Sequence, residues 1–454
     1  MTPSRMLRLP VPGSLRRLHV LGSLALILAL APPAPAADWP QWRGPERNGR
    51  SPETGLLAAW PEGGPPLAWR SGGVGAGYSS LAVVGERIYT SGDAGDSQYL
   101  VAVKRGDGGP LWKTRIGPAW EDEYLGARST PAVDGGRVYV IGTEGDVVCA
   151  DAASGQEVWR RNLVKDFGGA LMQAMGKYSW KFAESPLVDG DRVIVTPGAR
   201  DAALVALDKK TGKEIWRAKI PELGPKGDDG AAYSSVVVAD AAGVRQYVQL
   251  LGRGLIGVEA ASGRFLWGYN RVANDVANIA TPIVDGDHVF ASTGYDTGAA
   301  LLHLAGSDGK VEAREVYFLE ANVFQNHHGG LILHQGHVYT GTGHNKGFPL
   351  CVDHKTGEVA WGPVRTEGRG SAAVTYADGH LYFRYQDGHV VLVEATSEEY
   401  REKGSFKIPD VDQFSWSHPV VSGGILYLRE QDNLFAYDVR EPSPPAPLPG
   451  GEGR

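Results

Sequence analysis

One short motif returns along most of the chain and constrains its fold more than any other feature. An acidic residue is followed four positions later by glycine and eight positions later by tryptophan, and such self-similarity at a period of about 50 residues indicates a repeat architecture. The copies are Asp151…Gly155…Trp159, Asp208…Gly212…Trp216, Glu259…Gly263…Trp267 and Asp353…Gly357…Trp361, with Lys104…Gly108…Trp112 as a variant.

The residue types of this motif favour a β-hairpin. Asp or Glu followed by Ser or Thr bonds to nearby backbone N–H groups, and glycine supplies the positive φ that a short hairpin loop needs. An apolar run such as residues 147–150 enters the turn, and the strand that leaves it ends in tryptophan. The large apolar face of tryptophan suits the gap between two packed sheets.

A second turn, most often Val-Asp-Gly, precedes each unit of the repeat. Eight copies can be found, at residues 84–89, 133–140, 188–195, 238–247, 284–290, 333–339, 377–382 and 421–427. Each unit therefore supplies four short strands, which is typical of one blade of a β-propeller. The sequence predicts an all-β, eight-bladed β-propeller of four-stranded antiparallel blades over residues 67–440.

The two ends of the repeat region predict how the ring closes. The eighth unit reaches residues 435–438 without a following tryptophan strand, whereas residues 66–70 contain Trp69 without a preceding hairpin. We expect the N-terminal strand to complete the last blade, because closure removes open strand edges. The expected structural tryptophans between blades are Trp69, Trp112, Trp159, Trp216, Trp267 and Trp361.

The chain ends differ in composition from the repeats. Residues 1–36 have a basic start, an apolar run over residues 18–30 and a small-residue cleavage site, which predicts a signal peptide and a periplasmic or secreted protein. The Arg pair at 16–17 leaves twin-arginine export as an alternative. No other stretch could span a membrane. The Pro- and Gly-rich tail, 441–454, is expected to be disordered.

Residues 37–66 form an N-terminal extension without a clear period. We expect this extension to wrap the outside of the ring, with Trp39 and Trp42 capping a blade. The net charge of −7 is spread along the chain, and the absence of a basic stripe argues against nucleic acid as a partner. Cys149 and Cys351 lie far apart in the sequence and are expected to be free, and the protein is expected to be a monomer.

Equivalent positions before each innermost strand should meet at one mouth of the central channel. Superposing the repeats collects polar and aromatic side chains there, and such a mouth is the default binding site for ligands or partners. The expected binding residues are Tyr78, Arg128, Glu184, Tyr233, Asn278, His327, His328, Arg369, Trp416 and His418. The alternative is that they satisfy strand ends and hold channel water.

Two loops add alternatives for the same face. The acidic-aromatic loop 120–124 is either solvated or a wall of the binding face, and the insertion 163–181 is either a functional loop or a local hydrophobic plug. His327 and His328 could suggest a transition-metal site. Adjacent residues of a strand point to opposite faces, however, so we expect no shared metal ion.

The Gly-x-x-x-Trp turn resembles the tryptophan-docking repeat of the pyrroloquinoline quinone (PQQ) propeller superfamily. That superfamily includes quinoprotein alcohol dehydrogenases and the BamB-like propeller of the outer-membrane β-barrel assembly machine. The opening residues 39–45 and 51–56 look like those of secreted PQQ-like repeat proteins of planctomycete-type bacteria. The resemblance covers roughly residues 38–440 and implies the fold more strongly than the function.

The resemblance also implies what a dehydrogenase site would need. In that family Glu and Asn bind Ca²⁺, which makes Glu184 and Asn278 the candidate calcium ligands, and an Arg near the quinone would be Arg369. The catalytic Asp has no counterpart, since the equivalent stretch is residues 326–328. Vicinal cysteines and a C-x-x-C-H haem motif are also missing.

Function therefore divides into three hypotheses. The preferred one is a non-catalytic binding or scaffolding module without a cofactor, with a protein or small molecule bound at the mouth. The alternative is a PQQ- and Ca²⁺-dependent alcohol or sugar dehydrogenase. A hydrolase or lyase that uses the mouth His and Glu is the third, although no nucleophile motif supports it.

Overall fold

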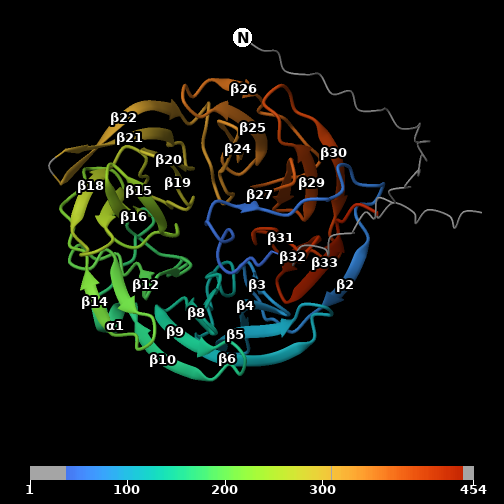
Figure 1. Ribbon diagram of the computed structural model, residues 1–454, viewed down its shortest axis with the longest axis horizontal. Helices are drawn as coiled ribbons and strands as arrows, with labels where there is room; N and C mark the ends of the chain where they lie inside the picture. The colour runs from blue at the N-terminus through green and yellow to red at the C-terminus, as the bar shows by residue number, and fades with distance from the viewer. Residues whose placement is uncertain (1–36, 308, 443–454) are drawn as a thin grey trace, which may run out of the picture. The chain divides into compact units, whose positions relative to one another are not determined.

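Short, continuous apolar runs such as those of residues 138–141 and 147–150 build each repeat into one four-stranded antiparallel sheet. The computed structural model describes residues 37–307 and 309–442. In the second repeat β7 (Ala132–Asp134), β8 (Arg137–Ile141), β9 (Asp146–Asp151) and β10 (Glu157–Asn162) are neighbours in chain order. Seven further sheets follow the same plan around a central channel, which confirms the eight-bladed propeller (Figure 1).

The remaining blades have the following strands. Blade one is β3 (Ala82–Val84), β4 (Arg87–Ala94), β5 (Ser97–Lys104) and β6 (Pro110–Pro118); blade three is β11 (Leu187–Asp189), β12 (Arg192–Val195), β13 (Val205–Asp208) and β14 (Glu214–Arg217); blade four is β15 (Val237–Ala241), β16 (Val244–Leu251), β17 (Gly254–Glu259) and β18 (Phe265–Tyr269). Blade five is β19 (Ile283–Asp285), β20 (His288–Thr293), β21 (Gly298–Ser307) and β22 (Lys310–Glu320); blade six is β23 (Ile332–His334), β24 (His337–Thr342), β25 (Phe348–Asp353) and β26 (Val359–Trp361). Blade seven is β27 (Ala372–Ala377), β28 (His380–Tyr385), β29 (His389–Glu394) and β30 (Glu402–Lys407), and blade eight is β31 (Val420–Ser422), β32 (Ile425–Glu430), β33 (Asn433–Asp438) and β2 (Leu67–Ser71).

The ring closes as the sequence predicts. β2 pairs antiparallel with β33, with Trp69 opposite Ala436, so the N-terminal strand is the outer strand of the last blade. The side chain of Trp69 then reaches blade one, where a Cβ on Gly108 would lie 2.8 Å from its ring. The same contact that joins other blades therefore also joins the last blade to the first.

The motif tryptophans of blades one to three pack on the motif glycine of the next blade. A Cβ on Gly212 would lie 2.7 Å from the Trp159 ring, and a Cβ on Gly263 would lie 2.5 Å from the Trp216 ring. Both glycines also have a positive φ. The Trp159 Nε1–H donates to Lys209 O at 3.1 Å, directly after the acidic turn residue of the next blade. Glycine therefore meets two requirements: it adopts the positive φ of the turn, and its missing Cβ leaves room for the indole ring.

Blade five has no copy of the motif, and the docking contacts change around it. Trp267 of blade four donates instead to Gln246 Oε1 at 2.6 Å within its own blade. Tyr317 of β22 takes the tryptophan role toward blade six, since its hydroxyl donates to His354 O at 2.9 Å and its ring lies 3.0 Å from a Cβ on Gly357.

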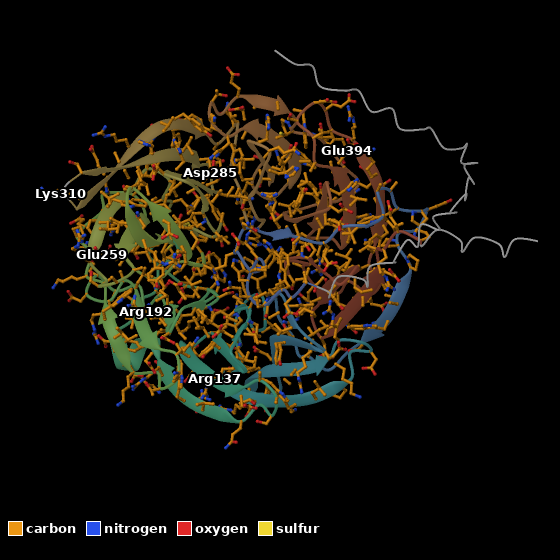
Figure 2. All side chains as sticks on the ribbon, in the orientation of Figure 1. Arg137, Arg192, Glu259, Asp285, Lys310 and Glu394 are labelled. Carbon is orange, nitrogen blue, oxygen red and sulfur yellow. The ribbon has the colours of Figure 1, made fainter. Side chains whose placement is uncertain are left out.

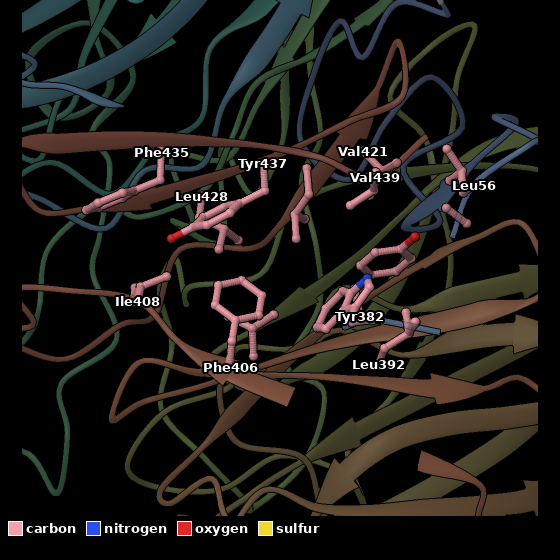
Figure 3. Packing of buried hydrophobic residues seen from close by; sticks show 14 residues of the cluster. Leu56, Tyr382, Leu392, Phe406, Ile408, Val421, Leu428, Phe435, Tyr437 and Val439 are labelled. Carbon is pink, nitrogen blue, oxygen red and sulfur yellow. The ribbon is translucent and has the colours of Figure 1, made fainter. Parts of the chain in front are cut away.

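Buried apolar residues fill the gaps between neighbouring blades. Figure 3 shows the cluster between blades seven and eight, where Tyr382, Leu392 and Phe406 face Leu428 and Tyr437. Charged residues such as Glu259, Lys310 and Glu394 lie toward the periphery of the ring (Figure 2). Cys149 and Cys351 are buried and unpaired.

The N-terminal extension does not wrap the outside of the ring over its first half. The blue segment in Figure 1 lies inside the ring, where β1 (Arg50–Ser51) adds a parallel strand to β27 and Trp39 exchanges backbone hydrogen bonds with Val83 of β3. Arg43 and Arg47 of this extension donate to carbonyl groups at residues 331, 186 and 185, directly before the innermost strands β23 and β11. Only its second half moves outward, where Trp60 packs on Phe406.

Helical structure is limited in the described part of the chain. The short helix α1 (Leu163–Phe167) is capped by Asn162, which accepts hydrogen bonds from Val164 N and Lys165 N. No helix among the described residues is long and apolar enough to cross a membrane. The predicted signal peptide, 1–36, and nearly all of the predicted tail lie outside the described residues.

Candidate functional site

A cavity of about 270 Å³ lies at the centre of the ring, where the segments before the innermost strands converge. The entry segments are tied to each other by backbone hydrogen bonds, such as Tyr78 N–H to Ala127 O at 2.7 Å and Tyr233 N–H to Asn278 O at 3.1 Å. Seven of the ten residues expected at the mouth line this cavity: Tyr78, Arg128, Tyr233, His327, His328, Trp416 and His418.

Glu184 is not among the lining residues. Its side chain is 2% exposed, and Oε1 accepts a hydrogen bond from Thr196 N at 2.6 Å inside blade three. Oε2 has no partner among the described residues. Burial raises the pKa of Glu184 to about 7, an effect that Thr196 and the nearby Arg47 partly oppose.

Asn278 and Arg369 also lie outside the lining. The Asn278 Nδ2 group donates to Leu251 O at 3.1 Å and Gly252 O at 2.8 Å, and Oδ1 accepts from Asn274 N. This amide therefore holds the blade-four loop with all of its polar atoms. Arg369 is exposed. Alignment of the repeats predicts where the backbone of a residue lies, but it does not predict the direction of the side chain.

Aromatic side chains that superposition of the repeats misses complete the walls. Tyr124 and Trp180 come from the two loops, 120–124 and 163–181, whose roles the sequence leaves open. Trp42 comes from the N-terminal extension, Tyr295 from the turn between β20 and β21, and Phe414 from the segment before β31. The aromatic residues of these two loops were the sequence feature that could have identified Tyr124 and Trp180 as lining residues.

These rings pack on one another around Trp416. The centroid of its ring lies 4.8 Å from that of Tyr78, 5.0 Å from that of Tyr124 and 4.9 Å from that of Phe414. On the other side, Trp180 lies 5.7 Å from Tyr233. The cavity thus offers several aromatic faces to a ligand, and such faces supply large contact area at low entropic cost.

The histidines of the cavity are neutral. His327 is held between the Ser371 hydroxyl at 2.6 Å and the Tyr295 hydroxyl at 3.0 Å, and burial lowers its pKa. Burial, followed by the charge of Arg43, lowers the pKa of His418 to about 3. Its Nε2 lies 3.1 Å from His328 O, so Nε2 carries the hydrogen and Nδ1 is a free acceptor.

The expected orientation of the adjacent histidines is wrong. The rings of His327 and His328 stack with centroids 3.8 Å apart, because both residues precede β23 and do not lie in a strand. The described residues contain no group of three or more His, Cys, Asp or Glu arranged to hold a metal ion.

Two arginines supply the charge of the cavity. Arg128 donates to Tyr124 O at 2.8 Å and Gly126 O at 3.1 Å and lies 5.2 Å above the Trp120 ring. Arg43 of the extension is 3% exposed and donates from Nη2 to Leu331 O at 2.6 Å. Burial lowers the pKa of each to about 10, so both stay charged at neutral pH.

The polar groups that line the cavity are cationic, neutral or only weakly basic. Neither Asp nor Glu is among the lining residues, and the neutral histidines have strongly lowered pKa values. The residues that would hold a Ca²⁺–PQQ pair do not fit that group, since Glu184 Oε1 and Asn278 Oδ1 accept from backbone N–H groups and neither side chain lines the cavity.

Comparison with known proteins agrees with this architecture. A family model described as outer membrane protein assembly factor BamB matches residues 96–363, more than half of the chain. The chain belongs to this family of PQQ-like repeat propellers. It is 26% identical to the BamB of Kangiella koreensis over 48% of this chain and 48% of that protein.

Other relatives of this PQQ-like propeller are enzymes by name. The chain is 28% identical to the quinohemoprotein alcohol dehydrogenase ADH IIB of Pseudomonas putida over 44% of this chain and 31% of that protein. The matches thus span less than half of either curated relative. The quinohemoprotein alcohol dehydrogenase structure from Comamonas testosteroni superposes with a TM-score of 0.61 at 13% identity, covering 90% of this chain and 81% of that chain, which shows a shared fold.

Proposed function

We propose that this PQQ-like propeller is an exported, non-catalytic binding module, and that its ligand or a partner segment occupies the aromatic cavity at the channel mouth. The proposal treats the cavity as a recognition surface built by most blades at once. Export rests on the composition of residues 1–36, and cell fractionation tests it. The expected monomer is testable by light scattering.

The orientation of Glu184 carries this proposal. It is the acid that repeat alignment brings nearest to the cavity, yet its carboxylate accepts from Thr196 N and is excluded from the lining. A general base must come within hydrogen-bond reach of the proton it abstracts. The remaining polar groups at the cavity are cations, neutral imidazoles, hydroxyls and amides, which orient a ligand without accepting its proton readily.

The second candidate is a PQQ- and Ca²⁺-dependent alcohol or sugar dehydrogenase. The match to the Pseudomonas putida quinohemoprotein alcohol dehydrogenase favours it. In that case, PQQ and calcium would supply the redox chemistry, and Glu184 would have to turn from Thr196 into the cavity.

Dye-linked oxidation distinguishes the two candidates. The purified protein, incubated with PQQ and CaCl₂, is assayed with ethanol, 1-butanol and glucose in the presence of a reducible dye. We expect no substrate-dependent dye reduction above the rate without protein. Dye reduction that requires both PQQ and alcohol, and that is lost in Glu184→Gln, would overturn the proposal in favour of the dehydrogenase.

A further inference from the structure

The two guanidinium groups at the cavity have no acidic partner within ion-pair distance. Among the described residues the salt bridges include neither Arg43 nor Arg128. Arg128 satisfies two N–H groups with loop carbonyls, and Arg43 does the same with Asn48 O and Leu331 O. Carbonyl dipoles solvate a cation but do not neutralise its charge.

Arg43 also keeps unused donors. Its Nε and Nη1 are buried and have no hydrogen-bond partner among the described residues. A Cβ on Gly330, another lining residue, would collide with Nη1, so only glycine lets this guanidinium occupy its place at the cavity. A buried, unpaired donor on a charged group is costly, and the charge of Arg43 still acts on the cavity that it lines.

The nearest acids do not fill this role. Glu184 interacts with Arg47 electrostatically, but it is outside the cavity lining and burial raises its pKa. Asp93 lies near enough to Arg128 to affect its charge, yet its carboxylate accepts from Gln98 Nε2 at 2.7 Å and Trp120 N at 2.7 Å. The lining of the cavity therefore holds two cations and no carboxylate, and Asp93 acts on Arg128 from outside the lining.

The walls define the rest of the ligand. Aromatic faces of Tyr78, Trp180 and Trp416 suit the flat or apolar face of a ring. Hydroxyl and amide side chains among the lining residues suit a few polar substituents. The volume of about 270 Å³ is near the lower end of ordinary ligand cavities, which run from about 300 to 1,000 Å³.

We infer that the cavity binds a small organic monoanion, a carboxylate carried on a single six-membered ring, with the carboxylate directed to Arg128, the ring between the aromatic walls, and the charge of Arg43 adding to the attraction. This inference rests on the proposed binding function and specifies its ligand class. A carboxylate and a guanidinium form charge-assisted, often paired hydrogen bonds, which are about twice as strong as neutral ones. Two sources share this chemistry, namely aromatic acids and sugar acids.

The direct test compares each acid with its uncharged amide in the wild-type protein. Isothermal titration calorimetry with benzoate, benzamide, glucuronate and glucuronamide, each to about 10 mM, measures four affinities. We expect at least one acid to bind, about tenfold or more tighter than its amide. Binding of benzoate alone identifies an aromatic acid, and binding of glucuronate alone identifies a sugar acid. Binding of neither acid, or equal binding of acid and amide, would overturn the inference.

Variants locate the interaction. Arg128→Gln is expected to lower the affinity for the acid about tenfold or more and to leave the affinity for its amide unchanged. Arg128→Lys should restore part of the lost affinity. Arg43→Gln should act in the same direction if it folds, as judged by its unfolding transition. Arg50→Gln is the matched control, because Arg50 lies on the same extension but is exposed outside the cavity. Equal losses in Arg128→Gln and Arg50→Gln would refute the assignment.

The outcomes remain separable from those of the proposed function. PQQ-dependent dye reduction would refute non-catalytic binding whatever the acids do. If neither dye reduction nor acid binding is observed, the proposed binding function stands and only the inference about its ligand class fails.

Discussion

The contact between a motif tryptophan and the next motif glycine explains why both residues recur together. The indole ring lies where a glycine Cβ would stand, and its N–H satisfies a carbonyl of the same turn, as Trp159 does with Lys209 O at 3.1 Å. One side chain thereby supplies apolar contact, a hydrogen bond and the register between two blades.

Truncating this indole should be costly. Trp159 is 8% exposed, so we expect Trp159→Ala to lower the free energy of unfolding by about 3–5 kcal/mol, measured by chemical denaturation. The control is Val158→Ala, because the neighbouring Val158 is 40% exposed, and it should lower the free energy of unfolding by less than about 1 kcal/mol. Equal small losses in both variants would show that the indole does not hold the blades together.

Glu184 makes stability depend on pH. Burial raises its pKa from 4.5 to about 7, so between these values the folded protein holds a proton that the unfolded chain has released. The free energy of unfolding therefore falls as pH rises through this window, by about 3 kcal/mol for this group alone. Denaturation at pH 5, 6, 7 and 8 should show that Glu184→Gln removes this part of the slope. An unchanged slope would contradict the buried, protonated carboxyl.

At the scale of elements, β2 and the N-terminal extension have separate roles. β2 covers the edge of β33, whereas the preceding residues lie across innermost strands in the channel. We therefore expect a chain that starts at residue 52 to stay soluble but to unfold at lower denaturant. A chain that starts at residue 73 exposes the β33 edge and should aggregate, as size-exclusion chromatography would show. A soluble, cooperative form of the shorter chain would contradict closure by β2.

Blades could be predicted from the sequence because their signals are local. Turn residues and short apolar runs are properties of short segments, and they predict each hairpin and the closing role of Trp69. The role of Tyr317 could not be predicted, because it stands in place of a tryptophan in a blade that has no copy of the motif. The position of the extension could not be predicted either, because arginines such as Arg43 and Arg47 usually lie at the surface. Here both are buried and donate to carbonyl groups that are distant in the sequence.

At the scale of the whole molecule, the ring brings one short segment of nearly every blade to one cavity. Equivalent repeat positions predicted seven lining residues, since propeller symmetry fixes backbone position. Symmetry does not decide which side chains turn inward, so Glu184, Asn278 and Arg369 did not reach the lining. The result is a cationic, aromatic cavity in which the acid expected to bind calcium faces the protein interior.

Direct titration of PQQ in the presence of Ca²⁺ tests this account most sharply. Calorimetry on the wild-type protein, with Glu184→Gln as the matched variant, measures uptake without depending on turnover. Tight binding of a Ca²⁺–PQQ pair requires oxygen ligands for the metal, and no carboxylate lines the cavity, so we predict no calcium-dependent one-to-one uptake at micromolar PQQ. Stoichiometric, calcium-dependent uptake that is lost in Glu184→Gln would contradict the account, because the carboxylate would then have to serve the cavity.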